Sequence, residues 1–327
     1  MPSEGMVNPG ETVDDQEPTA KSKLMLNSVS ALTKSLDREP AQPEMELSEL
    51  LPTVRPRDLD QEQENDDYRM VSQLFDYQIL QEEPNFGVKR CKNTLYKGQI
   101  VDRKRTGIGV LIYATGRVYE GEWMDEKRNG KGFEVYTSGT KYIGQFLNNR
   151  PHGKGVFSWP NGEVYDGEWA QGKKHGFGIW KGLQGDSYVG EWSDGKVEGY
   201  GVHQWTNGDK YEGEWLNCLK HGQGTDVFAN GDVFIGSYAF GRPNGFGSYR
   251  WKNGASYVGH FQNGHKYGHG KWRKDKRPGC NSYDGFFLND KKHGRGVFTW
   301  ESGNCYDGNY MDDLREGYGE MYWSDGT

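Results

Sequence analysis

The sequence predicts an all-β protein, built as one elongated, single-layer antiparallel sheet of stacked β-hairpins behind an acidic N-terminal tail. Three observations predict this fold: a repeat of fixed length, an alternation of aromatic residues with glycine, and a sharp change of composition near residue 86. The chain of 327 residues contains 48 Gly, 11 Trp, 20 Tyr and 14 Phe, but only 33% of its residues are hydrophobic. Such a chain has too few apolar residues for a large closed core and too many aromatic residues for simple disorder.

The first segment, residues 1–86, is acidic and lacks tryptophan. It holds 7 Lys/Arg and 19 Asp/Glu, a net charge of −12, with 8 of the 12 prolines and only 2 of the 48 glycines. We expect most of this tail to be disordered, because it cannot bury enough apolar surface to offset the entropy of ordering.

Two stretches of the tail have apolar residues at helical spacing: Met25, Val29, Leu32 and Leu36, and then Val71, Leu74, Phe75 and Gln78 after a possible cap at Asn65 or Asp66. Two interpretations stay open. The stretches form transient helices in a disordered tail, or one of them docks on a partner or on the rest of the chain.

The second segment, residues 87–327, repeats one pattern ten times. Tyr-x-Gly-x-aromatic begins the repeats, with Phe once for Tyr and Ile100 in place of the last aromatic residue in the first repeat, and a Gly-x-Gly follows it. The first residues of the ten repeats are Tyr96, Tyr119, Tyr142, Tyr165, Tyr188, Tyr211, Phe234, Tyr257, Tyr283 and Tyr306. Every step is 23 residues, except one of 26 between Tyr257 and Tyr283. A period of this length indicates a repeat array of about 23-residue units.

The order of residues within a repeat indicates a β-hairpin. In Tyr165-Asp166-Gly167-Glu168-Trp169 the rings and the glycine alternate with carboxylates, so a strand would place rings on one face and carboxylates on the other. We expect the glycines to leave room for a neighbouring ring over the bare backbone. The positions that define the repeat, and that we expect to hold the fold, are clearest in three repeats: Tyr119, Gly121 and Trp123; Tyr165, Gly167 and Trp169; Tyr211, Gly213 and Trp215.

Ten hairpins predict twenty strands, and about 4.8 Å per strand gives a sheet on the order of 95 Å long. The three extra residues of the eighth repeat lie within Lys271–Ser282, where we expect a local bulge with the sheet continuing on both sides. Thr327 lies two residues before the next expected repeat start at position 329. Because a last strand exposes an open edge, we expect either that the chain continues or that this edge pairs with another subunit.

The repeat resembles a known module. Tyr119-Glu120-Gly121-Glu122-Trp123, and Tyr165–Trp169 followed by Gly172-Lys173-Lys174-His175-Gly176-Phe177-Gly178, are similar to the MORN repeat over about residues 94–327. The resemblance implies a scaffold or adaptor module. MORN arrays occur in ciliary radial-spoke-head proteins, membrane-bridging junctophilins, parasite cytoskeletal scaffolds, plant phosphatidylinositol phosphate kinases and a SET-domain lysine methyltransferase.

No catalytic, cofactor or metal site is predicted. The Gly-x-Gly pairs enter strands and not helices, which excludes the dinucleotide-binding fingerprint, and no Walker loop is present. His260, His265 and His269 lie close together, but no Cys or carboxylate completes a zinc site. The four widely spaced cysteines and the lack of a signal peptide or a long apolar run indicate a cytoplasmic protein with reduced thiols.

The turn after each Tyr-x-Gly-x-aromatic strand is basic. Successive turns of this kind should project from one long edge of the sheet, two strands or roughly 10 Å apart. One interpretation is ordinary turn chemistry that aids solubility; the other is a binding edge for an extended anionic partner. Its candidate residues are Lys127, Arg128, Arg150, Lys173, Lys174, Lys196, Lys220, Arg242, Lys266, Lys291, Lys292 and Arg315. Of these, we expect Lys173, Lys174, Lys291 and Lys292 to be exposed, because they lie in turns.

Two functions follow from the sequence. The first is a non-enzymatic scaffold of a cytoskeletal assembly, most directly of the ciliary axoneme and its radial-spoke heads, with other protein subunits or acidic tubulin tails as partners. The alternative is an adaptor that binds phosphoinositide-bearing membranes, or the regulatory part of a phosphatidylinositol phosphate kinase. The acidic tail is a third candidate partner of the basic edge. Nucleic acid is not expected, because the net charge is −7 and no reader motif is present.

Overall fold

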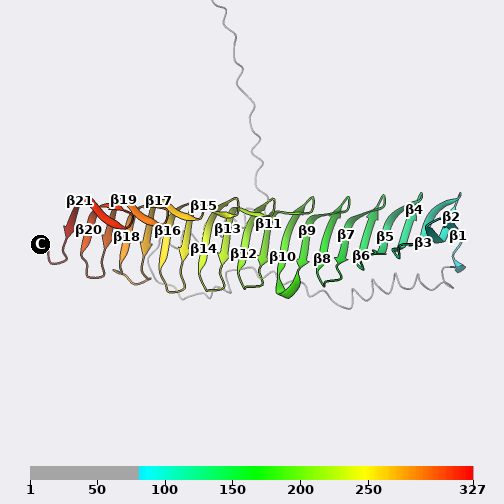
Figure 1. Ribbon diagram of the computed structural model, residues 1–327, viewed down its shortest axis with the longest axis horizontal. Coiled ribbons are helices and arrows are strands. Elements are labelled where there is room, and N and C mark those ends of the chain that lie inside the picture. Colours follow the sequence, from blue (N-terminus) through cyan, green and yellow to red (C-terminus); the bar gives the residue numbers. More distant parts are fainter. Residues whose placement is uncertain (1–80, 327) are drawn as a thin grey trace, which may run out of the picture. The chain divides into compact units, whose positions relative to one another are not determined.

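The computed structural model describes residues 81–326, which form one antiparallel sheet of twenty-one strands, with a single 3₁₀ turn at Leu183–Gly185 (Figure 1). The two amphipathic stretches predicted in the tail lie outside these residues. The strands follow one another in chain order, because each strand pairs with the one before it and the one after it. The predicted all-β class and open single sheet are confirmed.

The strands are β1 (Phe86–Cys91), β2 (Thr94–Val101), β3 (Lys104–Tyr113), β4 (Val118–Met124), β5 (Lys127–Val135), β6 (Lys141–Leu147), β7 (Arg150–Ser158), β8 (Val164–Ala170), β9 (Lys173–Lys181), β10 (Ser187–Ser193), β11 (Lys196–Gln204), β12 (Lys210–Leu216), β13 (Leu219–Val227), β14 (Val233–Ala239), β15 (Arg242–Arg250), β16 (Ser256–Gln262), β17 (His265–Arg273), β18 (Ser282–Leu288), β19 (Lys291–Thr299), β20 (Cys305–Met311) and β21 (Leu314–Tyr322).

The ten predicted hairpins are β2–β3 through β20–β21, and β1 is one strand more than the sequence predicted. β1 pairs with the free edge of β2, from Phe86 opposite Gln99 to Cys91 opposite Thr94. This pairing covers an edge that would otherwise expose unpaired N–H and C=O groups. The position of the boundary between tail and array stays a prediction.

Each repeat contains two different turns, which lie on opposite long edges of the sheet. The first turn joins the two strands of a hairpin. At Asn148 and Asn149 both φ angles are positive, 49° and 72°, which is the two-residue turn that suits the twist of a hairpin. The second turn is longer: the Gly162 N–H donates to Trp159 O at 3.0 Å, and the Trp159 N–H donates to Glu163 O at 2.9 Å. We call the two sides the first-turn edge and the second-turn edge.

A ladder of rings along one face of the sheet forms the core. Tyr165 is fully buried and meets Trp169 of its own strand edge-on, with centroids 5.2 Å apart and planes at 89°. It meets Trp192 of the next repeat in the same way, at 5.3 Å and 84°. The same pair of contacts recurs along most of the array, so each Tyr holds two successive repeats together. We call this side the aromatic face and the opposite side the outer face.

Glycines make this ladder possible. A Cβ at Gly167 would sit 2.5 Å from the Gly178 Cα and 2.7 Å from the Tyr165 hydroxyl oxygen. That hydroxyl donates to Glu168 O at 3.0 Å, while the Trp169 Nε1–H donates to Gly155 O at 2.9 Å. The buried polar tips of both rings therefore have backbone partners, as buried Tyr and Trp require.

The three extra residues of the eighth repeat lie in its second turn and not within a strand. Strands β17 and β18 pair without interruption from Gly268 opposite Phe287 to Arg273 opposite Ser282. The loop between them closes where the Lys274 N–H donates to Asn281 O at 2.9 Å. The sheet continues on both sides, as predicted, but the irregularity is an enlarged turn.

Among residues 81–326, no helix has the length and apolar character that crossing a bilayer would need.

Candidate partner-binding surfaces

The first-turn edge carries two basic positions per repeat, and the structure separates them. The first position points away from the sheet and is exposed, and it often contacts the turn of the next repeat. Lys173 Nζ lies 3.2 Å from Asp194 Oδ1, and Lys196 Nζ donates to Asn217 Oδ1 at 2.9 Å. The outward side chains of the predicted edge are Lys127, Arg150, Lys173, Lys196, Arg242 and Lys291.

The second position turns toward the aromatic face. Lys174 Nζ lies 4.5 Å from the ring centre of Trp192, 4.8 Å from that of Tyr165 and 5.2 Å from that of Trp159. Cations over ring faces are favourable because the face of an aromatic ring is electronegative. The other inward side chains of the predicted edge also lie over rings, namely Arg128, Lys220, Lys266, Lys292 and Arg315.

Burial lowers the pKa of two inward lysines. Desolvation by the surrounding rings lowers the pKa of Lys174 to about 8, and it lowers the pKa of Lys266 in the same direction. We expected the turn residues Lys173, Lys174, Lys291 and Lys292 to be exposed. Lys173 and Lys291 are exposed, but the expectation is wrong for Lys174 and Lys292, which are half-buried over rings because alternate residues of a strand face opposite sides.

The separation leaves the exposed edge almost neutral. The ten four-residue first turns contain fifteen Lys/Arg and seven Asp/Glu. Seven of the fifteen, including Arg105, lie over rings, so eight basic side chains remain to face seven acidic ones at the edge. Anion binding by this edge stays a prediction.

Two buried carboxylates that the repeat pattern does not predict lie on the aromatic face. Glu134 is fully buried and forms ion pairs with Arg117 and Arg128. Asp226 accepts a hydrogen bond from the Tyr238 hydroxyl at 2.6 Å and lies 2.5 Å from Lys220 Nζ. The signal was present, because an acid occupies the position that is a ring in most other repeats.

The outer face, where the repeat pattern predicted carboxylates, also carries exposed rings. A stripe of four exposed rings crosses strands β15 to β18, and we call it the ring stripe: Phe246, His260, His269 and Phe286. The ring centres of Phe246 and His260 lie 5.5 Å apart, and those of His269 and Phe286 lie 5.6 Å apart. His260 Nδ1 lies 3.4 Å from His269 O, so the two pairs are adjacent.

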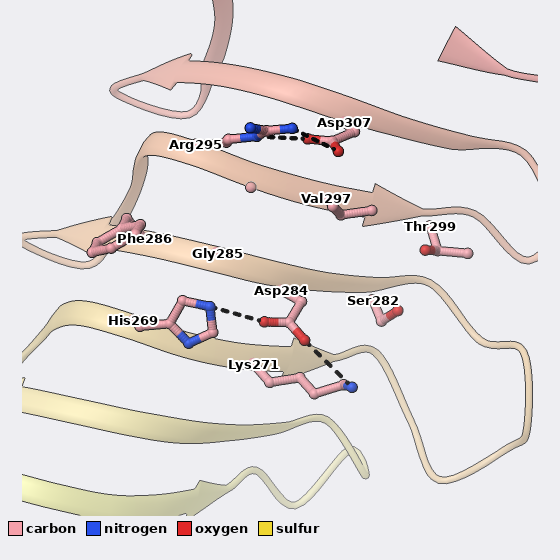
Figure 2. A pocket seen from close by; sticks show the side chains of 11 residues that line it. His269, Lys271, Ser282, Asp284, Gly285, Phe286, Arg295, Val297, Thr299 and Asp307 are labelled. Carbon is pink, nitrogen blue, oxygen red and sulfur yellow. Dashed lines mark hydrogen bonds and ion pairs between the residues drawn. The ribbon is translucent and has the colours of Figure 1, made fainter. Parts of the chain in front are cut away.

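A shallow, open hollow lies beside the ring stripe (Figure 2). Asp284 lies at its centre, with Oδ1 3.2 Å from His269 Nε2 and Oδ2 3.5 Å from Lys271 Nζ. On the far side Arg295 makes two contacts of 3.2 Å with the Asp307 carboxylate. The hollow thus offers charged donors and acceptors next to an exposed ring, an arrangement suited to binding a polypeptide.

The three histidines that lie close together in the sequence do not converge. His265 is on the first-turn edge with Nδ1 2.6 Å from Asp290 Oδ2, whereas His260 and His269 are on the outer face. Over the part of the chain that the structure describes, no three His, Cys, Asp or Glu side chains are grouped to hold a metal ion.

Several solved structures share a distant similarity with this chain. The TCP10 domain of Danio rerio CPAP, in complex with a peptide of STIL, is 11% identical; the match covers 72% of this chain and 93% of that chain, with a TM-score of 0.28. The TCP domain of Drosophila melanogaster SAS-4, in complex with a proline-rich motif of Ana2, is 11% identical and covers 57% of this chain and 90% of that chain, with a TM-score of 0.25. Virginiamycin B lyase from Staphylococcus aureus is 12% identical and covers 75% and 86%, with a TM-score of 0.14. TM-scores this low carry no functional argument.

No curated protein matches the chain in sequence. The family model described as MORN repeat matches nine segments: residues 96–116, 119–141, 142–164, 165–187, 188–210, 211–233, 234–256, 283–305 and 306–327. The unmatched stretch between residues 256 and 283 holds the β16–β17 hairpin and the enlarged turn, and its strands pair like those of the other repeats. MORN repeats are typically non-enzymatic modules of protein-interaction scaffolds. This chain belongs to the MORN-repeat family.

Proposed function

We propose that this protein is a non-enzymatic scaffold that holds protein subunits together in a cytoskeletal assembly, and that the assembly is the ciliary axoneme, in the manner of a radial-spoke-head protein. The observation that carries the proposal is the ring stripe, exposed on a sheet whose other rings mostly hold the fold. Phe246 and Phe286 are each about half exposed, at 52% and 50%. Exposed rings that lie together are typical anchors of protein–protein interfaces.

The charge of the first-turn edge also favours a protein partner. Since its exposed basic side chains are nearly balanced by acidic ones, the edge provides weak attraction for a polyanion. Exposed ion pairs of this kind contribute little binding or stability. The ring stripe combines apolar contact with the charged groups of Asp284 and Arg295, which is the composition of a specific protein interface.

The axoneme is the finer part of the proposal. It is supported by the family, whose members include radial-spoke-head scaffolds, and by the form of the array. A sheet of ten hairpins presents equivalent positions every two strands, roughly 10 Å apart, so one chain provides several docking points along an extended partner.

A second candidate function is binding to an anionic membrane, in the manner of an adaptor or of the regulatory part of a phosphatidylinositol phosphate kinase. It is favoured by Arg150 and Arg242, two exposed basic residues of the first-turn edge that have no ion-pair partner within residues 81–326. Acidic tubulin tails would use the same groups.

Localisation in ciliated cells, with and without the ring stripe, tests the proposal. We expect the wild-type protein to co-sediment with axonemes and the double variant Phe246→Ser, Phe286→Ser to be lost from that fraction. Phe177→Ser is the matched control, because Phe177 is equally exposed on the outer face, at 51%, but lies outside the stripe. Wild-type protein that is absent from axonemes and binds phosphoinositide vesicles would overturn the proposal in favour of the second candidate.

A further inference from the structure

Three side chains on the outer face of the first repeats are more deeply buried than a single-layer sheet explains. Val110 on β3, Glu120 on β4 and Phe133 on β5 lie side by side in register and are 6%, 1% and 9% exposed. Val189 occupies the register of Glu120 in a later repeat, between Ile179 and Val202, and is only half-buried. Aliphatic neighbours within the sheet leave Val189 only half-buried. The deeper burial of Val110, Glu120 and Phe133 therefore requires a further part of the protein that lies over them.

The carboxyl group of Glu120 is the most unusual member of this group. Both of its oxygens are buried and neither has a hydrogen-bond partner. Burial raises its pKa to about 8. A buried ionised carboxylate without a partner is very costly, so the group is held in its neutral form when it is covered.

The residues just before β1 lie close to the Val110–Glu120–Phe133 group. Gln81 and Glu82 are helical, and Pro84 O accepts a hydrogen bond from Gln99 Nε2 at 3.2 Å. The Ile100 N–H donates to Asn85 O at 2.9 Å. These contacts hold the end of the N-terminal segment against β2, the strand next to the Val110–Glu120–Phe133 group.

We propose that residues 66–80 dock in cis as an amphipathic helix on the outer face of β3 to β5, and that Val71, Leu74 and Phe75 cover Val110, Glu120 and Phe133. The length fits: β2 and β5 are three strands, about 14 Å, apart, and a helix of residues 66–80 is about 22 Å long. The outer face under this helix is unusually apolar, and it includes Ile108, Val110, Ile112, Val118, Val135 and Ile143.

Charge and tethering favour this segment over a second copy or an unrelated partner. The segment carries Asp66, Asp67 and Asp76 against one basic residue, Arg69, a net charge of −2, and the outer face carries Lys97 on β2 and Lys131 on β5. A segment joined by only a few residues has a high effective concentration at its site, so modest contacts are enough to keep it docked.

Glu120 makes this docking pH-dependent. Val110 flanks it on β3, and the ionisable outer-face residues of the surrounding strands are Lys97 on β2, Glu122 on its own strand and Lys131 on β5. The docked segment would add Asp66, Asp67, Tyr68, Arg69, Asp76 and Tyr77. Because docking requires neutral Glu120, its equilibrium constant falls by about tenfold for each pH unit between the ordinary carboxyl pKa and about 8, and is constant outside that window.

Amide hydrogen exchange of the full chain, followed by mass spectrometry and corrected for intrinsic rates, tests the proposal. We expect residues 66–80 to be protected in the wild-type protein at pH 6 and to lose protection by about tenfold per pH unit up to pH 8. Glu120→Gln should keep the protection at every pH, because the amide is neutral and nearly the same size.

Two matched pairs of variants locate the contact. Leu74→Asp should abolish the protection, while Gln73→Asp, on the opposite side of the predicted helix, should leave it. Phe133→Ala should reduce it, while Ile179→Ala, which lies further along the outer face, should not. The proposal would be overturned if residues 66–80 of the wild-type protein exchanged at unprotected rates. It would also be overturned if their protection were lost on dilution, because that would show docking between two copies.

Discussion

The hydroxyl oxygen of Tyr165 lies 2.4 Å from the position that a Cβ would occupy at Gly178, on the neighbouring strand. The ring therefore lies directly against glycine backbone, and no residue with a side chain fits beneath it without a shift. The same relationship joins Tyr119 to Gly132 and Tyr211 to Gly224. Each repeat thus contains a slot that admits one ring and requires glycine on both strands of the hairpin.

Replacing the glycine should destabilise the sheet. Gly167→Val would place a Cβ within 2.5 Å of the Gly178 Cα, which is backbone that cannot turn away, so we expect a loss of about 3 kcal/mol in the free energy of unfolding. Gly213→Val should behave alike. Lys154→Val, on the exposed outer face of β7, is the control that should leave the urea midpoint nearly unchanged. Equal midpoints for Gly167→Val and Lys154→Val would contradict the ring slot.

Removing a buried carboxylate from the aromatic face should also be costly. Glu134→Leu leaves Arg128 without the carboxylate that it contacts, and the side chain of Arg128 is only 11% exposed. We expect a loss of about 3 kcal/mol or more, because an unpaired buried charge remains. The double variant Glu134→Leu, Arg128→Met should recover much of that loss in thermal or urea unfolding. Additive losses in the double variant would show that the two side chains act independently.

Lys174 should make stability rise with pH between about 8 and 10. Its pKa is lowered to about 8 in the folded protein, below the ordinary lysine value of 10.5. The unfolded chain therefore holds a proton that the folded chain has lost across this window, and raising the pH favours folding. Lys174→Met should be more stable than the wild type at pH 7 and should weaken this dependence, of which Lys266 keeps a part, whereas Lys173→Met, with its exposed side chain, should change neither. The test is the melting temperature at pH 7 to 10, and identical profiles for the two variants would refute the assignment.

The two basic positions of the first-turn edge should respond differently to charge reversal. Changing the outward residues Lys127, Arg150, Lys173 and Arg242 to Glu should abolish any binding to anionic vesicles or acidic peptides while the protein stays folded. Such binding should weaken steeply with salt, since screening acts over about 8 Å at physiological ionic strength. Reversal of the inward Lys174 and Lys220 should instead lower the melting temperature. Deleting residues 1–86 should tighten anion binding if the acidic tail occupies the edge, and should leave it unchanged otherwise.

The unpaired side of β21 is a candidate site for β-strand addition. Within residues 81–326, β21 pairs only with β20, and it carries exposed side chains at Leu314, Tyr318 and Tyr322. An open edge with exposed rings favours β-strand addition. We expect concentration-dependent self-association or partner binding that Tyr318→Lys, placed on that edge, reduces. Two results together would rule out this edge as an interface: a wild-type protein that stays monomeric, and a Tyr318→Lys variant that binds its assembly normally.

The repeat, the hairpins and the ring ladder could be predicted from the sequence because each depends on neighbours at fixed short spacing. Tyr165, Gly167 and Trp169 share a face by the geometry of a strand alone, and the 23-residue period sets which rings meet. The same parity would have shown that Lys173 and Lys174 face opposite ways, so the inward position of Lys174 was predictable but was overlooked. The enlarged turn near Lys274 was located correctly because Pro and Gly mark it.

The fold class, the open sheet and the residues of its core follow from the order of residues along the chain, since in a sequential sheet the stabilising contacts lie within a repeat or between adjacent repeats. Which exposed residues lie together depends on the folded arrangement of the strands. Phe246 and Phe286 are forty residues apart, and they join one stripe only because the intervening strands place His260 and His269 between them. Glu120 and Glu212 both stand between the Tyr and the Gly that begin a repeat, so the neighbouring residues do not predict that Glu120 is the more deeply buried of the two. Its burial depends on what covers the outer face there, and contacts between distant parts of a chain are set by packing and not by sequence spacing.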